Sequence, residues 1–408
     1  MKKFEFLIIP ILFFLAGSLL QLYLDPKILP KLLILGTIAI LSYMILIFLP
    51  RKILENPIIF MLLYILTILI LIFNLTFGLK IAGTKRWIYL GSFTFQPSEF
   101  MKFILIPLLT FILKNSNITS RNKIMFTFII LLVPVILTFI QPDAGTAFIL
   151  LSIGLSIILK EYSNKIPQIP NYFLIYGTSF ILLFFTLILH WIFIFLLLFI
   201  IINNKYFFNK LGILILILLF ITPLSLNYLA KSSLFRGYQQ NRIKTFIILI
   251  KNKKLDEKLV EQENFNFNLK QSRITIGSGG LTGKGLQNIT QTRLKFLPEY
   301  KTDFMYATIA EAFGFLGIIT IITLYITLIW QVLNAKSNIP NNSSIELIKI
   351  GIASMLIIEL IISMGSNLGL LPTKGIPLPF IAYGGTSLIT HFMLLGLLAN
   401  LSDNNKPI

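Results

Sequence analysis

The sequence predicts an all-α polytopic integral membrane protein, and three observations support this fold class. Hydrophobic residues make up 56% of the 408 residues and charged residues only 12%, whereas soluble domains carry about a quarter charged residues. Apolar runs long enough to cross a hydrocarbon core of about 30 Å, at 1.5 Å per residue, recur along the whole chain. These runs are continuously apolar rather than alternating, which predicts helices and not the strands of a barrel.

Apolar runs define most of the expected spans, and one region is ambiguous. The 31-residue run at 172–202 fits either one tilted helix or a tight hairpin, and residues 211–229 form another run. The sequence therefore predicts about ten transmembrane helices, with twelve as the alternative. The spans expected outside the ambiguous region are 4–22, 31–49, 57–78, 97–113, 124–140, 143–159, 304–332, 345–370 and 378–400.

Basic residues near the ends of the first spans indicate the topology. The positive-inside rule places residues such as Arg51 and Lys114 in the cytoplasm. The segment between the two groups of spans then lies outside the cell, provided that the ambiguous region crosses the membrane an odd number of times. We therefore expect one integrated domain made of N-terminal transmembrane helices (1–230), a large extracytoplasmic loop (231–303) and C-terminal transmembrane helices (304–408).

The expected loop is strongly basic. Residues 231–302 hold 14 Lys or Arg against five Asp or Glu, a net charge of +9 within a chain whose formal charge is +19. Such a charge suggests nucleic acid in a soluble protein, but in this chain an anionic lipid headgroup is the nearer partner. Long loops are largely exempt from the positive-inside rule. The alternative is a solvated loop whose lysines reflect AT-biased coding.

Cysteine and histidine usage excludes several kinds of chemistry. The chain has no Cys and two His residues, which removes disulfides, thiolate catalysis and Cys-ligated metals. His190 and His391 each lie in an apolar run without a second His or a carboxylate one turn away. We therefore interpret both as bundle-facing side chains and predict no metal site.

Polar residues at two span ends are the first candidates for a site. Glu99 and Lys102 lie three residues apart in the first turns of the span that Pro97 begins, so they share a helix face. An ion pair inside a span is costly unless it faces a polar interior, and it serves either catalysis or bundle structure. Asp143 follows Pro142 in a tight turn between two spans, and composition favours the role of helix N-cap.

Asp303 is placed differently, because it lies where the basic loop meets the membrane and leads directly into Phe304. A helix N-cap is one interpretation. A general base under a basic loop is the other.

The glycine-rich stretch 278–285 matches neither nucleotide motif. Position 278 is Ser and position 285 is Gly, so a phosphate-binding P-loop is not formed, and Thr282 stands where a dinucleotide fingerprint needs Gly. The stretch reads as plain loop geometry or, alternatively, as a turn whose amides and Lys284 approach a phosphate.

Several blocks of the chain, taken together and in order, resemble the SEDS family (shape, elongation, division, sporulation) of polytopic cell-wall proteins. Their residues are Gly83 to Trp87, Gln96 to Glu99, Gln141 to Thr146, Tyr238 with Gln239 and Arg242, Gln271 to Gly285, Phe296 to Phe304, Gly369 to Pro372, Pro377 to Phe380 and Tyr383 to Gly385. The stretches 283–285, 290–291 and 296–299 look more like the elongation branch of the family, RodA, than the division branch, FtsW. Two positions depart from the family pattern: Lys301 replaces a histidine, and Ala312 replaces the second acid after Glu311.

The resemblance implies a peptidoglycan glycosyltransferase that polymerises lipid II on the outer face of the cytoplasmic membrane during elongation and shape maintenance. It implies that Asp303 is the catalytic base and that Glu99, Lys102 and Asp143 line the substrate cavity. Phosphate or lipid II candidates are Arg86, Arg242, Arg273 and Lys284.

The resemblance also implies a class B penicillin-binding transpeptidase as partner, besides membrane lipids, and no nucleic acid. No redox cofactor is required, and a divalent cation that bridges Asp303 or Asp143 to a pyrophosphate is an open alternative. Rival functions are a lipid II flippase or other transporter, a division glycosyltransferase of the FtsW type, and a scaffold without catalysis.

Overall fold

The computed structural model describes residues 4–78, 84–90, 93–116, 120–163, 264–335, 343–371 and 375–402. The chain divides into two compact units, of which the first comprises Met1–Lys165 with Phe267–Ile408 and the second Ile166–Asn266. The ambiguous spans at 171–230 and the start of the expected loop lie outside the described residues.

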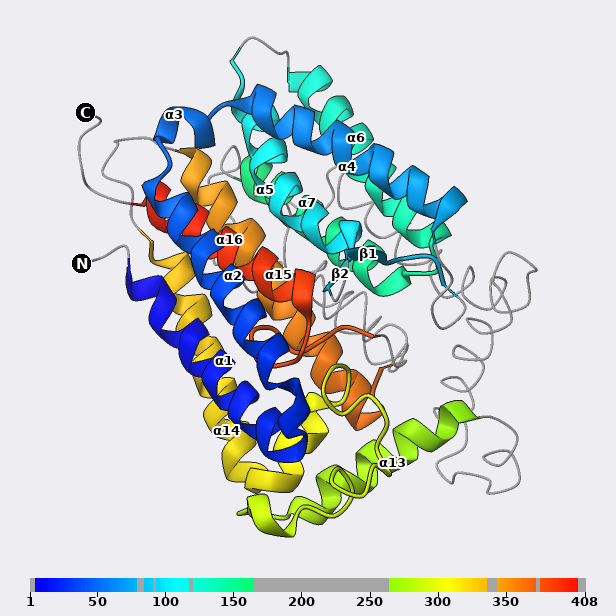
Figure 1. Ribbon diagram of the computed structural model, residues 1–408. Coiled ribbons are helices and arrows are strands. Elements are labelled where there is room, and N and C mark those ends of the chain that lie inside the picture. The colour runs from blue at the N-terminus through cyan, green and yellow to red at the C-terminus, as the bar shows by residue number, and fades with distance from the viewer. Residues whose placement is uncertain are drawn as a thin grey trace, which may run out of the picture. The chain divides into compact units, whose positions relative to one another are not determined.

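Every span expected from the described sequence is a helix (Figure 1). The helices are α1 (Glu5–Leu24), α2 (Leu29–Phe48), α4 (Pro57–Phe77), α5 (Pro97–Lys114), α6 (Ser120–Ile140), α7 (Ala144–Ser163), α14 (Met305–Leu333), α15 (Ser343–Leu368) and α16 (Gly385–Leu401). Short elements between them are η2 (Pro26–Ile28), α3 (Arg51–Leu54), β1 (Ile88–Leu90), β2 (Phe93–Phe95), α13 (Asn264–Gly279) and η3 (Leu286–Asn288). The two strands form an antiparallel hairpin in which Tyr89 faces Thr94.

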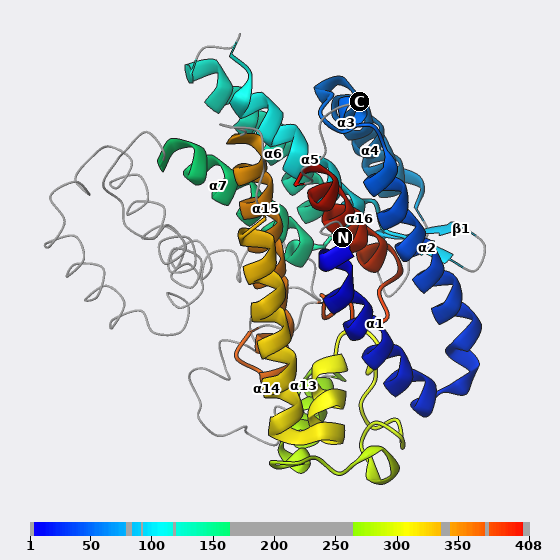
Figure 2. The ribbon, with the colours of Figure 1, turned by 90° about the vertical axis from the view of Figure 1, so that its left-hand side faces the viewer.

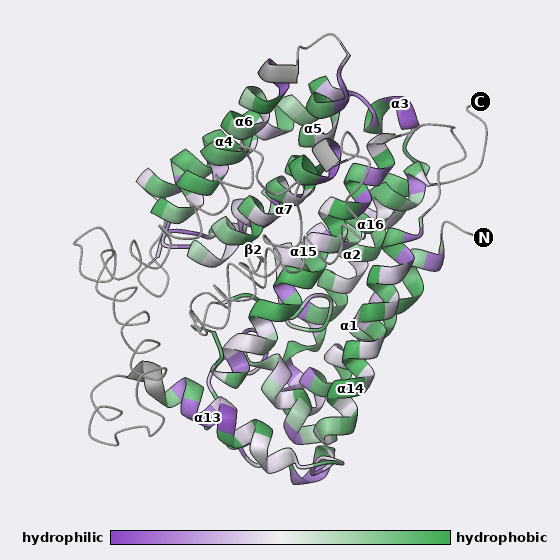
Figure 3. Ribbon diagram, turned by 180° about the vertical axis from the view of Figure 1, so that it is seen from behind, coloured by the Kyte–Doolittle hydropathy of each residue, from purple (hydrophilic) through white to green (hydrophobic). Residues whose placement is uncertain are grey.

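Most of these helices have the length and composition of membrane spans. Within the described residues, seven helices are long and apolar enough to cross a membrane. Helix α5 differs because its 18 residues carry three charges, Glu99, Lys102 and Lys114, and α16 has 17 residues. Hydrophobic colour dominates the spans in Figure 3, whereas α13 is rich in hydrophilic residues.

Two elements depart from the expected boundaries. The last span begins at Gly385 rather than at 378, because Pro377 and Pro379 cannot continue a regular helix. Helix α14 is interrupted at Gly314, whose φ of 64° and ψ of −160° are not helical. A glycine adopts such a conformation without a steric penalty.

The interior is built around α5, α15 and α16. Helix α16 packs against α2 and α5, and α15 packs against α5, α7 and α14 (Figures 1 and 2). Nearly all of α5 is buried, whereas α1, α2, α4 and α6 expose large apolar side chains as lipid-facing helices do. A Cβ at Gly396 of α16 would lie 2.9 Å from the Tyr43 carbonyl oxygen of α2, so a small residue permits this close packing.

Candidate active site

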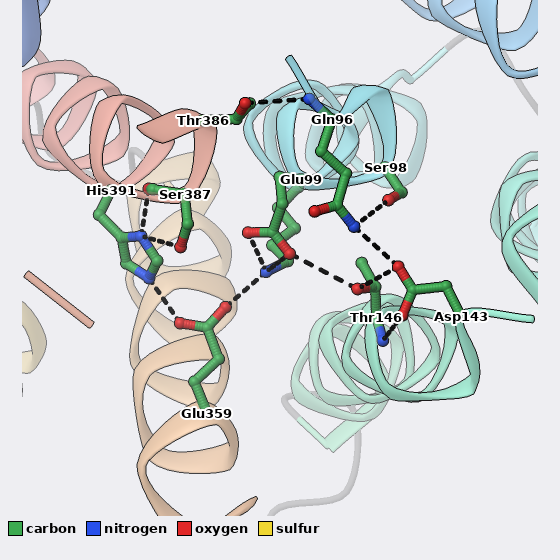
Figure 4. A network of polar contacts seen from close by, with 10 residues as sticks. Gln96, Ser98, Glu99, Asp143, Thr146, Glu359, Thr386, Ser387 and His391 are labelled. Carbon is green, nitrogen blue, oxygen red and sulfur yellow. Dashed lines mark hydrogen bonds and ion pairs between the residues drawn. The ribbon is translucent and has the colours of Figure 1, made fainter. Parts of the chain in front are cut away.

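A chain of buried charges crosses the interior from α5 to α15. Lys102 Nζ donates to both Glu99 carboxylate oxygens, at 2.8 and 2.7 Å, and to Glu359 Oε1 at 2.7 Å (Figure 4). The Lys102 side chain is 1% exposed and that of Glu99 is 7% exposed. The expected pairing of Glu99 with Lys102 in the interior is confirmed, and all three ammonium protons have acceptors.

Glu359 extends this chain to α16. His391 Nε2 lies 2.5 Å from Glu359 Oε2, and His391 Nδ1 lies 2.5 Å from the Ser387 carbonyl oxygen. The interpretation of His391 as bundle-facing is confirmed. Glu359 was not among the residues predicted from the sequence, although a carboxylate in the middle of the apolar run 345–370 is itself a signal of a functional or paired residue.

Asp143 lies at the centre of a second buried group. Its Oδ2 accepts from Gln96 Nε2 at 2.8 Å and from the Thr146 hydroxyl at 2.9 Å. Its Oδ1 accepts from the Thr146 amide at 3.3 Å, which confirms the N-cap of α7. Arg86 Nη1 lies 3.4 Å from Asp143 Oδ1, so one of the phosphate candidates is paired with this carboxylate.

The two groups meet at Thr146, whose hydroxyl oxygen lies 3.5 Å from Glu99 Oε1 (Figure 4). The main-chain amide of Gln96, at the start of α5, donates to the Thr386 hydroxyl at 2.9 Å and thereby connects α5 to the start of α16. Four residues predicted from the sequence, namely Arg86, Glu99, Lys102 and Asp143, therefore belong to one polar network.

Asp303 lies outside this network, in the turn that leads into α14. The Asp303 carbonyl oxygen accepts from Asn367 Nδ2 at 2.9 Å, and Asn367 Oδ1 accepts from the Ala307 amide at 3.2 Å. Asn367 therefore fixes both the turn and the first residues of α14 to the end of α15. The N-cap of α14 is Phe304, so the capping role considered for Asp303 is wrong.

The segment 375–384 packs against this turn at two points. A Cβ added at Gly375 would lie 3.0 Å from Asp303 Oδ2, so the Asp303 carboxylate rests against the Gly375 main chain. The Tyr383 amide donates to the Lys301 carbonyl oxygen at 2.8 Å. The Asp303 side chain is partly exposed, which leaves it accessible to a second molecule.

Arg273 flanks the same end of α15. Ser272, the preceding residue of α13, donates from its hydroxyl to the Asn367 carbonyl oxygen at 2.9 Å. The Arg273 side chain is exposed, and its Cδ would lie 3.5 Å from a Cβ at Gly369. Arg273 and Asp303 thus lie on segments that are both held by Asn367.

Lys284 belongs to a cluster of hydrogen bonds around the buried Glu311 carboxylate. The Lys284 ammonium lies 3.1 Å from Glu311 Oε1 and 2.9 Å from the Thr290 hydroxyl. The amides of Thr290, Gln291 and Thr292 also donate to Glu311. The role of Lys284 in phosphate binding stays a prediction.

The amides of the glycine-rich turn serve the fold. The Gly283 amide donates to the Gly279 carbonyl oxygen, and the Lys284 and Gly285 amides donate to the carbonyl oxygens of Glu311 and Ala312. These amides therefore fasten the turn to α14, which supports the interpretation as loop geometry.

Arg242 lies outside the described residues. Within the part of the chain that the structure describes, no group of three or more His, Asp or Glu side chains could hold a metal ion.

Asp303 and the buried network are separated along α15. Glu359 belongs to the network and Asn367 is bonded to Asp303, and these two residues are eight residues apart, about 12 Å along the helix axis.

Comparison with known proteins gives one family. The family model for cell cycle proteins of the FtsW, RodA and SpoVE type matches residues 7–190 and 183–407. A peptidoglycan glycosyltransferase MrdB of Helicobacter pylori is 28% identical over 81% of this chain and 74% of its own length. A probable peptidoglycan glycosyltransferase FtsW of Haemophilus influenzae is 29% identical over 81% of this chain and 70% of its own length.

Solved structures share the fold. A peptidoglycan synthase complex in which polymerization and crosslinking are coordinated contains a chain with a TM-score of 0.69 and 21% identity, covering 98% of this chain and 97% of that one. The rod shape determining protein RodA of Thermus thermophilus gives a TM-score of 0.62 at 20% identity, covering 98% of this chain and 96% of its own.

Proposed function

Because the chain belongs to the family of cell cycle proteins that comprises FtsW, RodA and SpoVE, we propose that it is a peptidoglycan glycosyltransferase. It is a multi-pass protein of the cytoplasmic membrane. Its relatives MrdB and FtsW carry that activity in their names. The proposed reaction polymerises lipid II into glycan strands on the outer face of the membrane.

One observation carries the proposal. Asp303 lies on a turn that is fixed through its main chain by Asn367, and its carboxylate is partly exposed beside Gly375. A carboxylate held at the end of the membrane-spanning bundle can approach the headgroup of a lipid substrate without leaving the protein. General bases are placed in this way, within reach of the proton that they accept.

The proposed chemistry is an inverting displacement. Asp303 accepts the proton of the acceptor sugar's 4-hydroxyl as that oxygen attacks C1 of the donor sugar. The bond between C1 and the pyrophosphate oxygen breaks, and the undecaprenyl pyrophosphate leaves. A carboxylate is a weak base toward a sugar hydroxyl, so the proton transfers late, as the new C1–O bond forms.

Cations that stabilise the departing pyrophosphate complete the site. Arg273 is the best placed of the described candidates, because α13 contacts Asn367 through Ser272. Lys284, Arg86 and Arg242 are weaker proposals. Lys284 and Arg86 already pair with Glu311 and Asp143, respectively.

Glu99, Lys102 and Asp143 are proposed to shape the substrate cavity rather than to react. Each is buried and already bonded to other side chains of the network. Their role is to hold the starts of α5, α7 and α16 in register beneath the reacting groups.

We propose a role in elongation and cell shape, in the manner of RodA. The solved RodA chain and relatives named MrdB match this protein. Relatives named FtsW match at similar identity, so a division glycosyltransferase is the nearest alternative. The similarity to a synthase complex in which polymerization and crosslinking are coordinated supports a class B penicillin-binding transpeptidase as partner.

A single reconstitution tests the function. Purified protein in liposomes receives labelled lipid II, and glycan strands and transfer between leaflets are both scored in the same sample. We expect strands from the wild-type chain. Leaflet transfer without strands would identify a flippase. If neither strands nor leaflet transfer are observed, the remaining function is that of a scaffold. Repeating the assay with EDTA decides whether a divalent cation takes part.

A further inference from the structure

Both ring nitrogens of His391 face oxygen atoms inside the bundle. Nδ1 lies 2.5 Å from the Ser387 carbonyl oxygen, and Nε2 lies 2.5 Å from Glu359 Oε2. The ring is fully buried, with the edge of the Phe380 ring against it at 5.1 Å between centroids. A carbonyl oxygen only accepts, so Nδ1 carries a proton.

A second proton must lie between His391 Nε2 and Glu359 Oε2, because two lone pairs at 2.5 Å would repel each other. The other oxygen of Glu359 accepts from the Lys102 ammonium at 2.7 Å, which stabilises the ionised carboxylate. The proton therefore belongs to the ring. We infer that His391 is an imidazolium and that Glu359 and His391 form a buried ion pair that positions Lys102.

Charge balance supports this assignment. With an imidazolium, the chain Glu99, Lys102, Glu359 and His391 holds two negative and two positive charges and is neutral. Without the proton shared by Glu359 and His391, the four groups would carry one uncompensated negative charge in an interior where such a charge is strongly unfavourable, and the Lys102 ammonium on Glu359 favours the ionised carboxylate and hence the ring as the site of that proton.

Among the described residues, the cations that pair with Glu359 are Lys102 and His391. The Tyr325 hydroxyl of α14 donates to the Pro379 carbonyl oxygen, and Asp143 of α7 is paired with Arg86. Among the described elements packed around the pair, α14 contributes the Tyr325 hydroxyl, and α5 contributes Glu99 and Lys102.

The pair acts through Lys102. Two of the three Lys102 protons are held by Glu99 and the third by Glu359, so an ionised Glu359 fixes the direction of the Lys102 side chain. The start of α5 is thereby held to α15 and α16. This positioning role rests on the proposed function, because its effect on activity is an effect on the glycosyltransferase cavity.

The protonation state can be measured without any activity. The chain has two His residues, so a His190→Gln variant labelled with ¹⁵N-histidine gives one imidazole spectrum in detergent micelles. We expect both ring nitrogens of His391 to be protonated from pH 6 to pH 9. A neutral ring at pH 7 would overturn the inference.

The Glu359→Gln change is the matched control for this measurement. A Gln side chain can donate its amide to a neutral Nε2, so the added proton is no longer required. We expect the ring to become neutral in that variant, with its remaining proton on Nδ1. An imidazolium that persists without Glu359 would disprove the pairing.

Rescue tests the positioning role. The His391→Met change removes one of the two cations that pair with Glu359 and leaves Lys102. We expect lipid II polymerisation to fall by about tenfold or more. Glu359→Gln added to His391→Met removes the unbalanced charge, and we expect activity to return to within about threefold of wild type. A role limited to packing predicts no such recovery, so a double variant as weak as His391→Met would overturn the proposal. If the wild-type chain makes no strands, the proposed function fails while the histidine spectrum still decides the ion pair.

Discussion

The buried network and the Asp303 turn hold carboxylates in opposite ways. In the network, Glu99, Glu359 and Asp143 are carried by or adjoin regular helices, and cations or hydroxyls of the protein bind each of them. Asp303 lies instead on a non-helical turn, and the hydrogen bond to Asn367 uses its main-chain oxygen rather than its side chain. The network carboxylates are buried, whereas the Asp303 side chain is partly exposed.

The difference indicates two tasks for acidic residues in one membrane protein. A buried carboxylate with all its partners in place stabilises a particular arrangement of helices, and removing one partner leaves an uncompensated charge. A carboxylate at the edge of the bundle, held by its backbone, can exchange protein and solvent contacts for a substrate. Changes in the network should therefore reduce folding stability and, through it, activity, whereas changes at the Asp303 turn should reduce the rate alone.

Asp303→Asn should give the largest effect on rate. General base catalysis typically contributes about 10²- to 10⁴-fold, and Asn preserves side-chain size, so we expect that loss in lipid II polymerisation with normal purified yield. The measurement is initial rate in liposomes at matched protein content. Glu299→Gln is the control, because Glu299 is the exposed acid of the same turn. Near wild-type rates for Asp303→Asn would remove the catalytic assignment.

Lys102→Met should separate folding from rate. It leaves Glu99 and Glu359 without their shared cation in a site where the lysine is 1% exposed, and breaking such a buried pair costs about 3–5 kcal/mol. We expect a lower yield of monodisperse protein and a lower unfolding temperature in detergent. Lys52→Met, at the short helix α3, is the surface control. Full stability with lost activity would instead place Lys102 among the reacting groups.

Gly375→Ala should affect the Asp303 turn alone. The added Cβ would lie 3.0 Å from Asp303 Oδ2, so the carboxylate must shift by a few tenths of an ångström. We expect a partial loss of polymerisation rate with an unchanged unfolding temperature. Gly277→Ala is the matched control, because a Cβ there meets nothing within 4 Å. Equal rates for the two variants would show that the position of the carboxylate tolerates this shift.

Asp143→Asn should be milder than Asp303→Asn. Asn caps a helix about as well as Asp and keeps an acceptor for the Thr146 amide, but it loses the charge that pairs with Arg86. We expect less than about a tenfold loss of activity, compared with about 10²- to 10⁴-fold at Asp303. Parallel rate measurements decide the order, and a reversed order would move the base into the network.

The smallest effect concerns the ion pair between Asp25 and Lys301, which joins the α1–α2 connection to the Asp303 turn at 2.5 Å. The hydrogen bond from Lys301 holds the pKa of the Asp25 carboxyl below its ordinary value of 3.8. Partial burial is the largest single effect and opposes the Lys301 charge, but the hydrogen bond to Asp25 and the interactions with Tyr300 and the Asp25 charge together outweigh it and raise the pKa of Lys301 above 10.5.

The sign of the pH dependence follows. The Asp25 contribution is present above pH 3.8 and disappears as the pH falls through the lowered pKa; the Lys301 contribution is present below pH 10.5 and disappears above the raised pKa. We expect Lys301→Met to lower the unfolding temperature slightly and equally at pH 6 and pH 8, because exposed pairs contribute little. The difference from wild type should vanish below the lowered pKa of Asp25. A difference that changes between pH 6 and pH 8 would require another titrating group.

Local patterns in the sequence predicted much of this protein. Continuous apolar runs gave the helices of the described spans to within a few residues, since a helix in lipid must satisfy its own backbone. The spacing of Glu99 and Lys102 predicted their pairing, and Pro142 followed by Asp143 predicted the cap of α7. The resemblance carried by the motifs named the family that the comparisons confirm.

Only the tertiary structure brought distant residues together. Glu359 lies 257 residues from Lys102, and His391 adds the fourth charge from another helix, so no local spacing could reveal the chain of charges. The interruption of α14 at Gly314 and the contact of Gly375 with Asp303 also depend on segments far apart in sequence. Sequence periodicity specifies which face of a helix is polar, but the partners of that face are decided by how the helices pack.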